Sequence, residues 1–172
     1  LAQFLFPRQA NGSLVTVNGR VVGSALIGQS FTQDRYFNPR PSAAGTGYDA
    51  SASGATNKGP TDAELADTLI AQSVAEAIAK DGAVKGKVPS DMATRSASGL
   101  DPHISPANAA LQVARVAKAR GADSAAVRAL VDRHVEGRQF GLFGEPRVNV
   151  LLLNIAVDSA FPHRVQHPVE RG

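Results

Sequence analysis

Residues 96–121, SASGLDPHISPANAALQVARVAKARG, contain the signals around which the rest of the chain is organised. Asp101 precedes Pro102 and Ser105 precedes Pro106, and a residue before proline is pushed toward extended backbone. Ser105 then stands where a helix N-cap belongs, with Pro106 at the first helical position, where its missing N–H costs nothing. Apolar residues recur at helical spacing up to Gly121, which is a typical stop signal. The pattern predicts a helix over residues 106–120.

The length and composition of the chain narrow the classes of protein to which it can belong. The chain has 172 residues, enough for one domain with a core, and a formal net charge of +3 with acidic and basic residues interspersed. Charge alone therefore argues only weakly for nucleic acid or an anionic membrane. Cysteine is absent, which excludes thiol chemistry, disulfides and cysteine-based metal sites.

The first half of the chain predicts a hairpin and a helix. β-branched runs at residues 14–17 and 21–22 flank Asn18-Gly19, the dipeptide that best fits a type I′ turn. Apolar residues keep helical spacing from a cap at Thr61 or Asp62 to Asp81-Gly82. Residues 84–88 are predicted to form a short strand.

The second half predicts one more helix and a strand. Asp123 or Ser124 would cap a helix that ends at Gly137. The apolar run over residues 147–157 indicates a buried strand. Together the patterns predict a single α+β domain, with a small, mostly antiparallel sheet, an N-terminal β-hairpin and about three packed helices.

The two ends differ from this domain, which we expect over residues 14–160. Residues 1–13 open with an apolar stretch that proline and then arginine end, so they are either the end of a hydrophobic segment or a buried strand. Residues 161–172 form a polar tail with two prolines, predicted to be frayed.

Motifs for chemistry are incomplete. Gly54 and Gly59 have the separation of a phosphate-binding loop, but Pro60 stands where the motif needs lysine, so an ordered loop is favoured over a nucleotide site. His103 lies near serines and Asp101, yet sequence neighbours rarely align as a catalytic triad. His163 and His167 alone have metal-ligand spacing and lie in the tail. We expect no catalytic residues, no metal and no enzyme.

One alternative is a DNA-binding protein. Ala117, Gly121 and Val127 fall at the small, turn-glycine and apolar positions of a helix-turn-helix. Arg120, however, occupies a position that such motifs normally bury, and few amide side chains follow for reading bases. A plain αα-hairpin explains the same pattern.

Several unusual segments resemble the KdpC family, the C subunits of the bacterial Kdp potassium-transporting P-type ATPases. They occur in family order between about residues 15 and 158: Gly23-Ser24, Leu26-Ile27-Gly28-Gln29, Tyr36-Phe37, Arg40-Pro41-Ser42, Ser53-Gly54, Asn57, Gly59-Pro60-Thr61, residues 98–106, Arg115-Val116-Ala117, Ala119-Arg120-Gly121, residues 144–150, and Leu153-Asn154.

The resemblance implies a single N-terminal membrane helix, of which residues 1–6 look like the end, and a soluble domain. It implies a non-catalytic accessory subunit in the bacterial inner membrane that works with the Kdp A, B and F subunits and with no nucleic acid. Two roles are implied: a catalytic chaperone that raises the ATP affinity of the B subunit, or an external cap on the channel-like A subunit. A translocated, cysteine-free domain suits the external side.

The resemblance also implies candidate residues. No cofactor is expected to bind tightly, although ATP is possible through the complex, with Gln29 or Gln112 as a conceivable nucleotide contact. The segments that would either pack rigidly or contact a partner subunit supply the expected interface residues, which are Tyr36, Arg40, Pro41, Ser42, Asp101 and His103.

Overall fold

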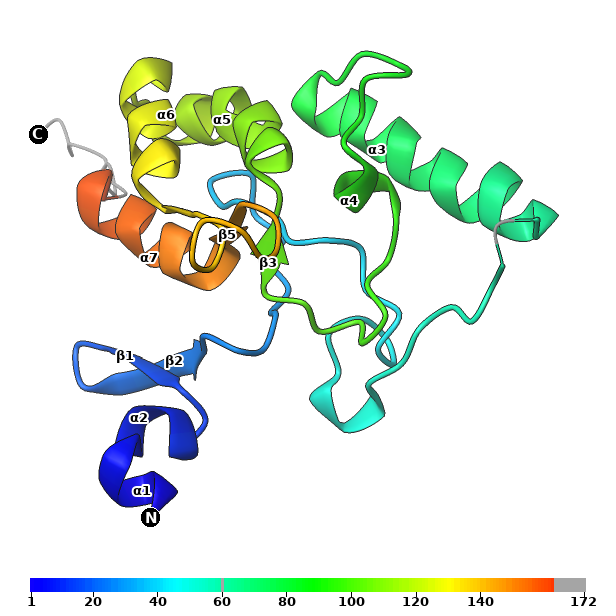
Figure 1. The fold of residues 1–172 in the computed structure, drawn as a ribbon. Helices are drawn as coiled ribbons and strands as arrows, with labels where there is room; N and C mark the ends of the chain where they lie inside the picture. Colours follow the sequence, from blue (N-terminus) through cyan, green and yellow to red (C-terminus); the bar gives the residue numbers. More distant parts are fainter. Residues whose placement is uncertain (60, 163–172) are drawn as a thin grey trace, which may run out of the picture.

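Helix α5 (Pro106–Arg120) contacts the helices α3 and α6 and the strand β5, and the fold is assembled around it (Figure 1). The computed structural model describes residues 1–59 and 61–162. Ser105 Oγ accepts the Asn108 backbone N–H at 3.1 Å, Pro106 occupies the first turn, and Gly121 ends the helix in the left-handed region with φ of 61°. The predicted start, body and end of this helix are therefore confirmed.

The N-terminal part forms the predicted hairpin. Short helices α1 (Ala2–Leu5) and α2 (Pro7–Ala10) precede strands β1 (Leu14–Val17) and β2 (Arg20–Ser24), which pair antiparallel. Asn18 and Gly19 have φ of 50° and 77°, as a type I′ turn requires. Figure 1 shows this hairpin at one end of the molecule, on the side of α7 and away from α5 and α6.

The middle of the chain is mostly loop before a long helix. A short 3₁₀ helix η1 (Ala50–Ala52) interrupts the loop, and a π-helical segment η2 (Leu65–Ile70) runs directly into α3 (Ala71–Asp81). Asp62 Oδ1 accepts the Leu65 N–H at 3.1 Å, which places the predicted cap at the start of this helix. Helix α4 (Ser90–Ala93) packs on α3.

The predicted strand over residues 84–88 is wrong. Those residues form a turn in which Gly86 has φ of 82°, and the strands described in the structure pair elsewhere. The valines at both ends suggested a strand, but a strand needs a partner edge, and none lies beside this segment in the described residues.

The C-terminal half corrects two further boundaries. Helix α6 (Ser124–Arg133) starts at the Asp123 cap but ends at His134, not Gly137, because β4 (Val135–Glu136) joins a sheet. The predicted strand over residues 147–157 is confirmed only for β5 (Arg147–Asn149), and α7 (Val150–Ala160) follows it. Asn149 Oδ1 accepts the Leu152 N–H at 3.1 Å and caps α7. Residues 150–153 form an unbroken apolar run, so the sequence there shows no period that separates helix from strand, although the buried residues of α7 lie on one face of the helix.

The second sheet has the order β3-β5-β4, with β3 (His103–Ile104) and β4 both antiparallel to β5. With the hairpin and the packed helices α3, α5, α6 and α7, the described chain confirms the predicted α+β class.

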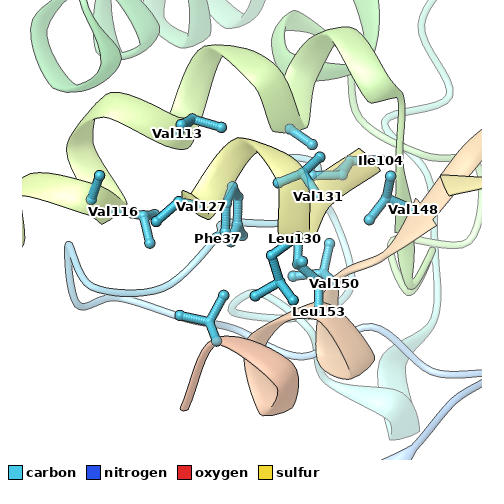
Figure 2. Close-up of a cluster of buried hydrophobic side chains, with 13 residues drawn as sticks. Phe37, Ile104, Val113, Val116, Val127, Leu130, Val131, Val148, Val150 and Leu153 are labelled. Atoms are coloured by element: carbon cyan, nitrogen blue, oxygen red, sulfur yellow. The ribbon is translucent and has the colours of Figure 1, made fainter. Parts of the chain in front are cut away.

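The hydrophobic core lies between α5, α6, α7 and this sheet. Figure 2 shows its side chains converging from these elements and from the loop that carries Phe37. The core cluster consists of Phe37, Ile104, Ala109, Val113, Val116, Ala117, Val127, Leu130, Val131, Val148, Val150, Leu153 and Val157. Phe37 is the one aromatic residue among these, with Phe31 and Phe161 packed partly buried against the cluster, which agrees with the low aromatic content of the chain.

Candidate functional site

Two buried amide side chains hold the loop that carries Phe37 and Asn38. Gln112 of α5 accepts the Asn38 backbone N–H at 2.7 Å and donates to the Asn38 carbonyl at 3.0 Å. Asn154 of α7 accepts the Phe37 backbone N–H at 2.8 Å and donates to the Phe37 carbonyl at 3.0 Å. Each side-chain amide thus binds both the backbone N–H and the carbonyl of one loop residue, as a neighbouring strand would. The two amides together hold the loop between α5 and α7.

Arg115 is the centre of this buried network. Its Nε lies 2.6 Å from Asp81 Oδ1, and both side chains are almost completely buried. Its remaining donors bind the carbonyl oxygens of Asp34 and Tyr36, the Asn38 side chain and Gln112 Oε1, at 2.6 to 2.9 Å. A fully paired guanidinium of this kind ties α3, α5 and the loop together.

Tyr36 lies at the edge of the same loop. The guanidinium carbon of Arg35 and that of Arg120 each lie 5.0 Å from the centre of the Tyr36 ring. Its hydroxyl donates to Asp158 Oδ2 at 3.1 Å, and Arg120 Nη2 lies 2.8 Å from Asp158 Oδ1. Tyr36 is therefore held by cation–π and charge-assisted contacts to α5 and α7.

Arg40 connects three segments that are distant in sequence. Its Nη1 lies 3.2 Å from Asp101 Oδ2, and Nη2 donates to the Arg95 carbonyl at 3.3 Å. Asp101 Oδ1 accepts the His103 backbone N–H at 3.0 Å and lies 3.5 Å from His103 Nδ1. Burial raises the pKa of the Asp101 carboxyl, but the hydrogen bonds from His103 and the charge of Arg40 outweigh it and leave the pKa below its usual value.

The His103 ring lies between two carboxylates. Its Nε2 is 3.9 Å from Glu136 Oε2, on the opposite side from Asp101. Glu136 Oε2 also accepts from Arg147 Nε at 3.0 Å. The cluster of Arg40, Asp101 and His103 thus continues across the sheet to β4 and β5.

Ser42 holds the loop that follows Arg40 in place through hydrogen bonds of its side chain. Its Oγ donates to the Gly99 carbonyl at 2.6 Å and accepts the Tyr48 N–H at 2.9 Å. The Tyr48 hydroxyl donates to the Arg40 carbonyl, and burial raises the pKa of Tyr48. A Cβ at Gly99, whose φ is 68°, would lie 2.6 Å from the Ala44 nitrogen, so only glycine fits there.

The structure brings some predicted site residues together and separates others. Arg40, Asp101 and His103 are in contact, whereas the two glutamines face different grooves. Gln112 and Pro41 line a groove of about 310 Å³, and Gln29 lines one of about 510 Å³ between the hairpin and α7. Gln29 donates to the Val22 carbonyl at 3.1 Å, and Gln112 is completely buried. Both nucleotide contacts, like the interface role of the other residues, stay predictions.

The glycine loop binds its own chain. The Gly54 N–H and the Ser53 hydroxyl both donate to the Ser98 carbonyl, at 3.0 and 2.9 Å. Lys58 Nζ lies 3.3 Å from Asp62 Oδ2 and 2.6 Å from Glu64 Oε2. The hydrogen bond that Lys58 donates to Glu64 raises the pKa of Lys58. Carboxylates therefore stand beside the lysine where a phosphate site would need a free cation.

Sequence reasoning missed Arg115, Asn154 and Asp91 as structural centres. Asp91 accepts from Ser105 N–H at 2.7 Å, Ser105 Oγ at 2.8 Å and Asn108 Nδ2 at 3.0 Å. A signal existed for two of them: Arg115 lies among apolar helix positions, and Asn154 interrupts an apolar run. A polar residue in such a place is expected to have a buried partner.

Helices α5 and α6 form an αα-hairpin. Val127, Leu130 and Val131 of α6 pack into the core shared with α5 and α7. The Arg120 side chain is 1% exposed and pairs with Asp158 of α7. The pattern that suggested a helix-turn-helix therefore serves the packing of this hairpin on α7.

Two further observations hold for residues 1–59 and 61–162. No helix there combines the length and the apolar character needed to cross a membrane. Within the same described part, no three side chains of the metal-binding types are grouped as a site. His163 and His167, the pair with ligand spacing, lie outside the described residues.

Comparisons with known proteins agree on one family. The family model described as KdpC: K+-transporting ATPase, c chain, matches residues 1–159. The potassium-transporting ATPase KdpC subunit of Gemmatimonas aurantiaca is 62% identical over 92% of this chain and 79% of its own length. Its counterparts from Rhodospirillum rubrum and Nitratidesulfovibrio vulgaris are 57% and 59% identical, over 94% and 92% of this chain and 83% and 80% of theirs.

None of these relatives lends support to the DNA-binding alternative. The family model spans the hairpin, the Arg40 cluster, the Arg115 network and nearly all of α7. The chain belongs to the KdpC family.

Proposed function

We propose that this chain is a non-catalytic accessory subunit of a potassium-transporting P-type ATPase, and that its domain caps the channel-like A subunit on the external side of the inner membrane. The observation that carries the proposal is the match to the K+-transporting ATPase c chain over residues 1–159. Assembly with A, B and F subunits, and attachment through an N-terminal membrane helix, follow from the same resemblance.

The contacts in the domain favour a cap over a nucleotide-binding chaperone. The polar atoms of the Gln112 amide bind Asn38, Asn108 and Arg115, and the Gly54 loop binds Ser98. A nucleotide would have to displace these internal hydrogen bonds, and leaving buried partners unpaired is costly. The rigid clamping of the loop of residues 36–42 instead suits a preformed surface that needs no ordering on contact.

The side of the membrane on which the domain lies can be tested with a single introduced cysteine. Because these 172 residues contain no cysteine, Val84→Cys in the exposed turn after α3 would be the one thiol among them. In intact spheroplasts that express the full-length protein with its partner subunits, we expect a membrane-impermeant maleimide to label it without permeabilisation. Labelling that requires permeabilisation would overturn the external cap.

Assembly and turnover provide the second test. The full-length protein should co-purify in detergent with a P-type ATPase subunit whose ATP hydrolysis responds to potassium. A cap predicts that loss of this chain changes the potassium dependence and leaves KM for ATP unchanged. A raised KM for ATP without this chain would favour the chaperone role instead.

A further inference from the structure

The loop of residues 138–145, between β4 and β5, presents an apolar tip on a closed frame. Gln139 and Phe143 exchange two backbone hydrogen bonds, at 2.8 and 2.9 Å. Phe140, Leu142 and Phe143 are 95%, 69% and 62% exposed. The frame therefore holds three large apolar side chains out into solvent, where water gives them no favourable partner.

The backbone at the tip is held in a conformation that phenylalanine disfavours. Phe140 has φ of 54° and Gly141 has φ of 72°, both in the left-handed region. Glycine or asparagine would adopt this conformation at Phe140 with less strain. A bulky aromatic residue that is both strained and exposed contributes little to the core, which makes its side chain a candidate for contact with another molecule.

The charges around the tip cancel. Arg138 Nη2 lies 3.0 Å from both carboxylate oxygens of Glu145, and Arg147 Nε lies 3.0 Å from Glu136 Oε2. Two arginines and two glutamates leave no net local charge with which to attract anionic lipid. An uncharged, apolar protein surface is the complementary occupant, since interface cores are depleted of charge and enriched in aromatic side chains.

The base of the loop adjoins the residues that sequence reasoning placed at an interface. Glu136 lies at the start of the loop, and its Oε2 is 3.9 Å from His103 Nε2. His103 in turn contacts Asp101, which pairs with Arg40. Polar contacts across the three-stranded sheet thus run from the Arg40 cluster to the base of the loop that carries the apolar tip.

We propose that Phe140, Leu142 and Phe143 form an anchor that inserts into an uncharged apolar socket on a partner subunit, outside the bilayer. This inference rests on the proposed function and names the surface that makes the contact. The preformed loop lowers the ordering cost of insertion, and the two phenylalanines are of the residue class that dominates interface energetics.

The test uses the full-length protein co-expressed with its partner subunits. A triple variant, Phe140→Asn, Leu142→Ser and Phe143→Ser, removes the apolar tip while asparagine tolerates the left-handed backbone. Val84→Ser, at a valine 62% exposed in another turn, is the matched control. We expect the triple variant to be retained on the detergent-purified complex at least about tenfold less than wild type, and the control to be retained normally.

Phe140→Gly alone separates binding from folding. Glycine suits the φ of 54°, so the melting temperature should stay the same or rise while retention on the complex falls. Retention of both variants within about twofold of wild type would overturn the anchor. If wild type itself does not co-purify with an ATPase subunit, the proposed function fails instead.

A membrane is the competing occupant. The 172-residue chain would be mixed with phosphatidylcholine vesicles, with and without phosphatidylglycerol, and floated on a density gradient. We expect no flotation that depends on the tip. Flotation of wild type that the triple variant loses would overturn the protein socket in favour of a lipid surface.

Discussion

The two ends of the fold differ in how they use apolar residues. Helices α5, α6 and α7 and the β3-β5-β4 sheet bury theirs in one cluster, whereas helices α1 and α2 bury no residue and the hairpin exposes Leu14, Val21 and Val22. Asn149 Nδ2 donates to the Ala25 carbonyl at 2.8 Å and links the hairpin to the body.

A two-stranded hairpin alone is at best marginally stable in water. Apolar composition alone therefore does not identify the stable part of this protein. We expect the global stability to come from the core half and the hairpin to open locally.

The sharpest test of this difference is Arg115→Leu. It leaves Asp81 as a buried, unpaired charge and several carbonyl groups without donors. We expect the free energy of unfolding to fall by about 4 kcal/mol, measured by urea denaturation with circular dichroism. Arg128→Leu, which removes an exposed pair with Asp132, should cost less than about 0.5 kcal/mol. Similar losses for both variants would contradict the role of the buried network.

Truncating one leucine in each region to alanine compares how much the two regions contribute to the free energy of unfolding. Leu153→Ala opens a cavity in the core and should lower the free energy of unfolding by about 3 kcal/mol. Leu26→Ala, at an exposed residue just after the hairpin, should change it by less than about 0.5 kcal/mol. Equal effects in urea denaturation would show that the hairpin shares the core's cooperativity.

Alanine at two left-handed glycines imposes comparable strain in the two regions. Gly121 and Gly19 have φ of 61° and 77°, and neither has an atom within 4 Å of an added Cβ. Gly121→Ala should lower the global free energy of unfolding by about 1 kcal/mol.

Gly19→Ala should instead speed hydrogen exchange of the β1 and β2 amides and leave the global transition unchanged. A global loss from Gly19→Ala that matches Gly121→Ala would mean that the hairpin unfolds only with the core.

The smallest expected effect is on the pH dependence. Because the pKa of Asp101 is lower in the folded state than its ordinary value of 3.8, its stabilising contribution is full above that value and disappears as pH falls through the folded pKa. Melting temperatures measured from roughly pH 6 to pH 2 should fall less steeply in Asp101→Asn than in wild type. Parallel curves would show that the contacts of the Asp101 carboxylate with His103 and Arg40 add no net stability.

Local signals were enough to predict the elements whose ends carry their own chemistry. Ser105, Pro106 and Gly121 define helix α5, and Asn18-Gly19 defines the hairpin, because caps and turns depend on the few residues that form them. The segment after Asn149 could not be assigned in this way, since its continuous apolar run fits a buried strand as well as a helix. Within residues 1–59 and 61–162, no strand pairs with residues 84–88, although their valines suggested one.

For the candidate site, as for the fold, some features followed from the sequence and others only from the tertiary structure. The sequence by itself determined the family, the class of fold and the residues worth examining, because these depend on motifs and periodicity carried by neighbouring residues. Only the tertiary structure decided that Arg40 meets Asp101 across 61 positions, that Gln112 holds Asn38 across 74, and that Gln29 faces a different groove. Contacts between distant segments arise from the packing of helices and strands, so a local pattern does not encode them.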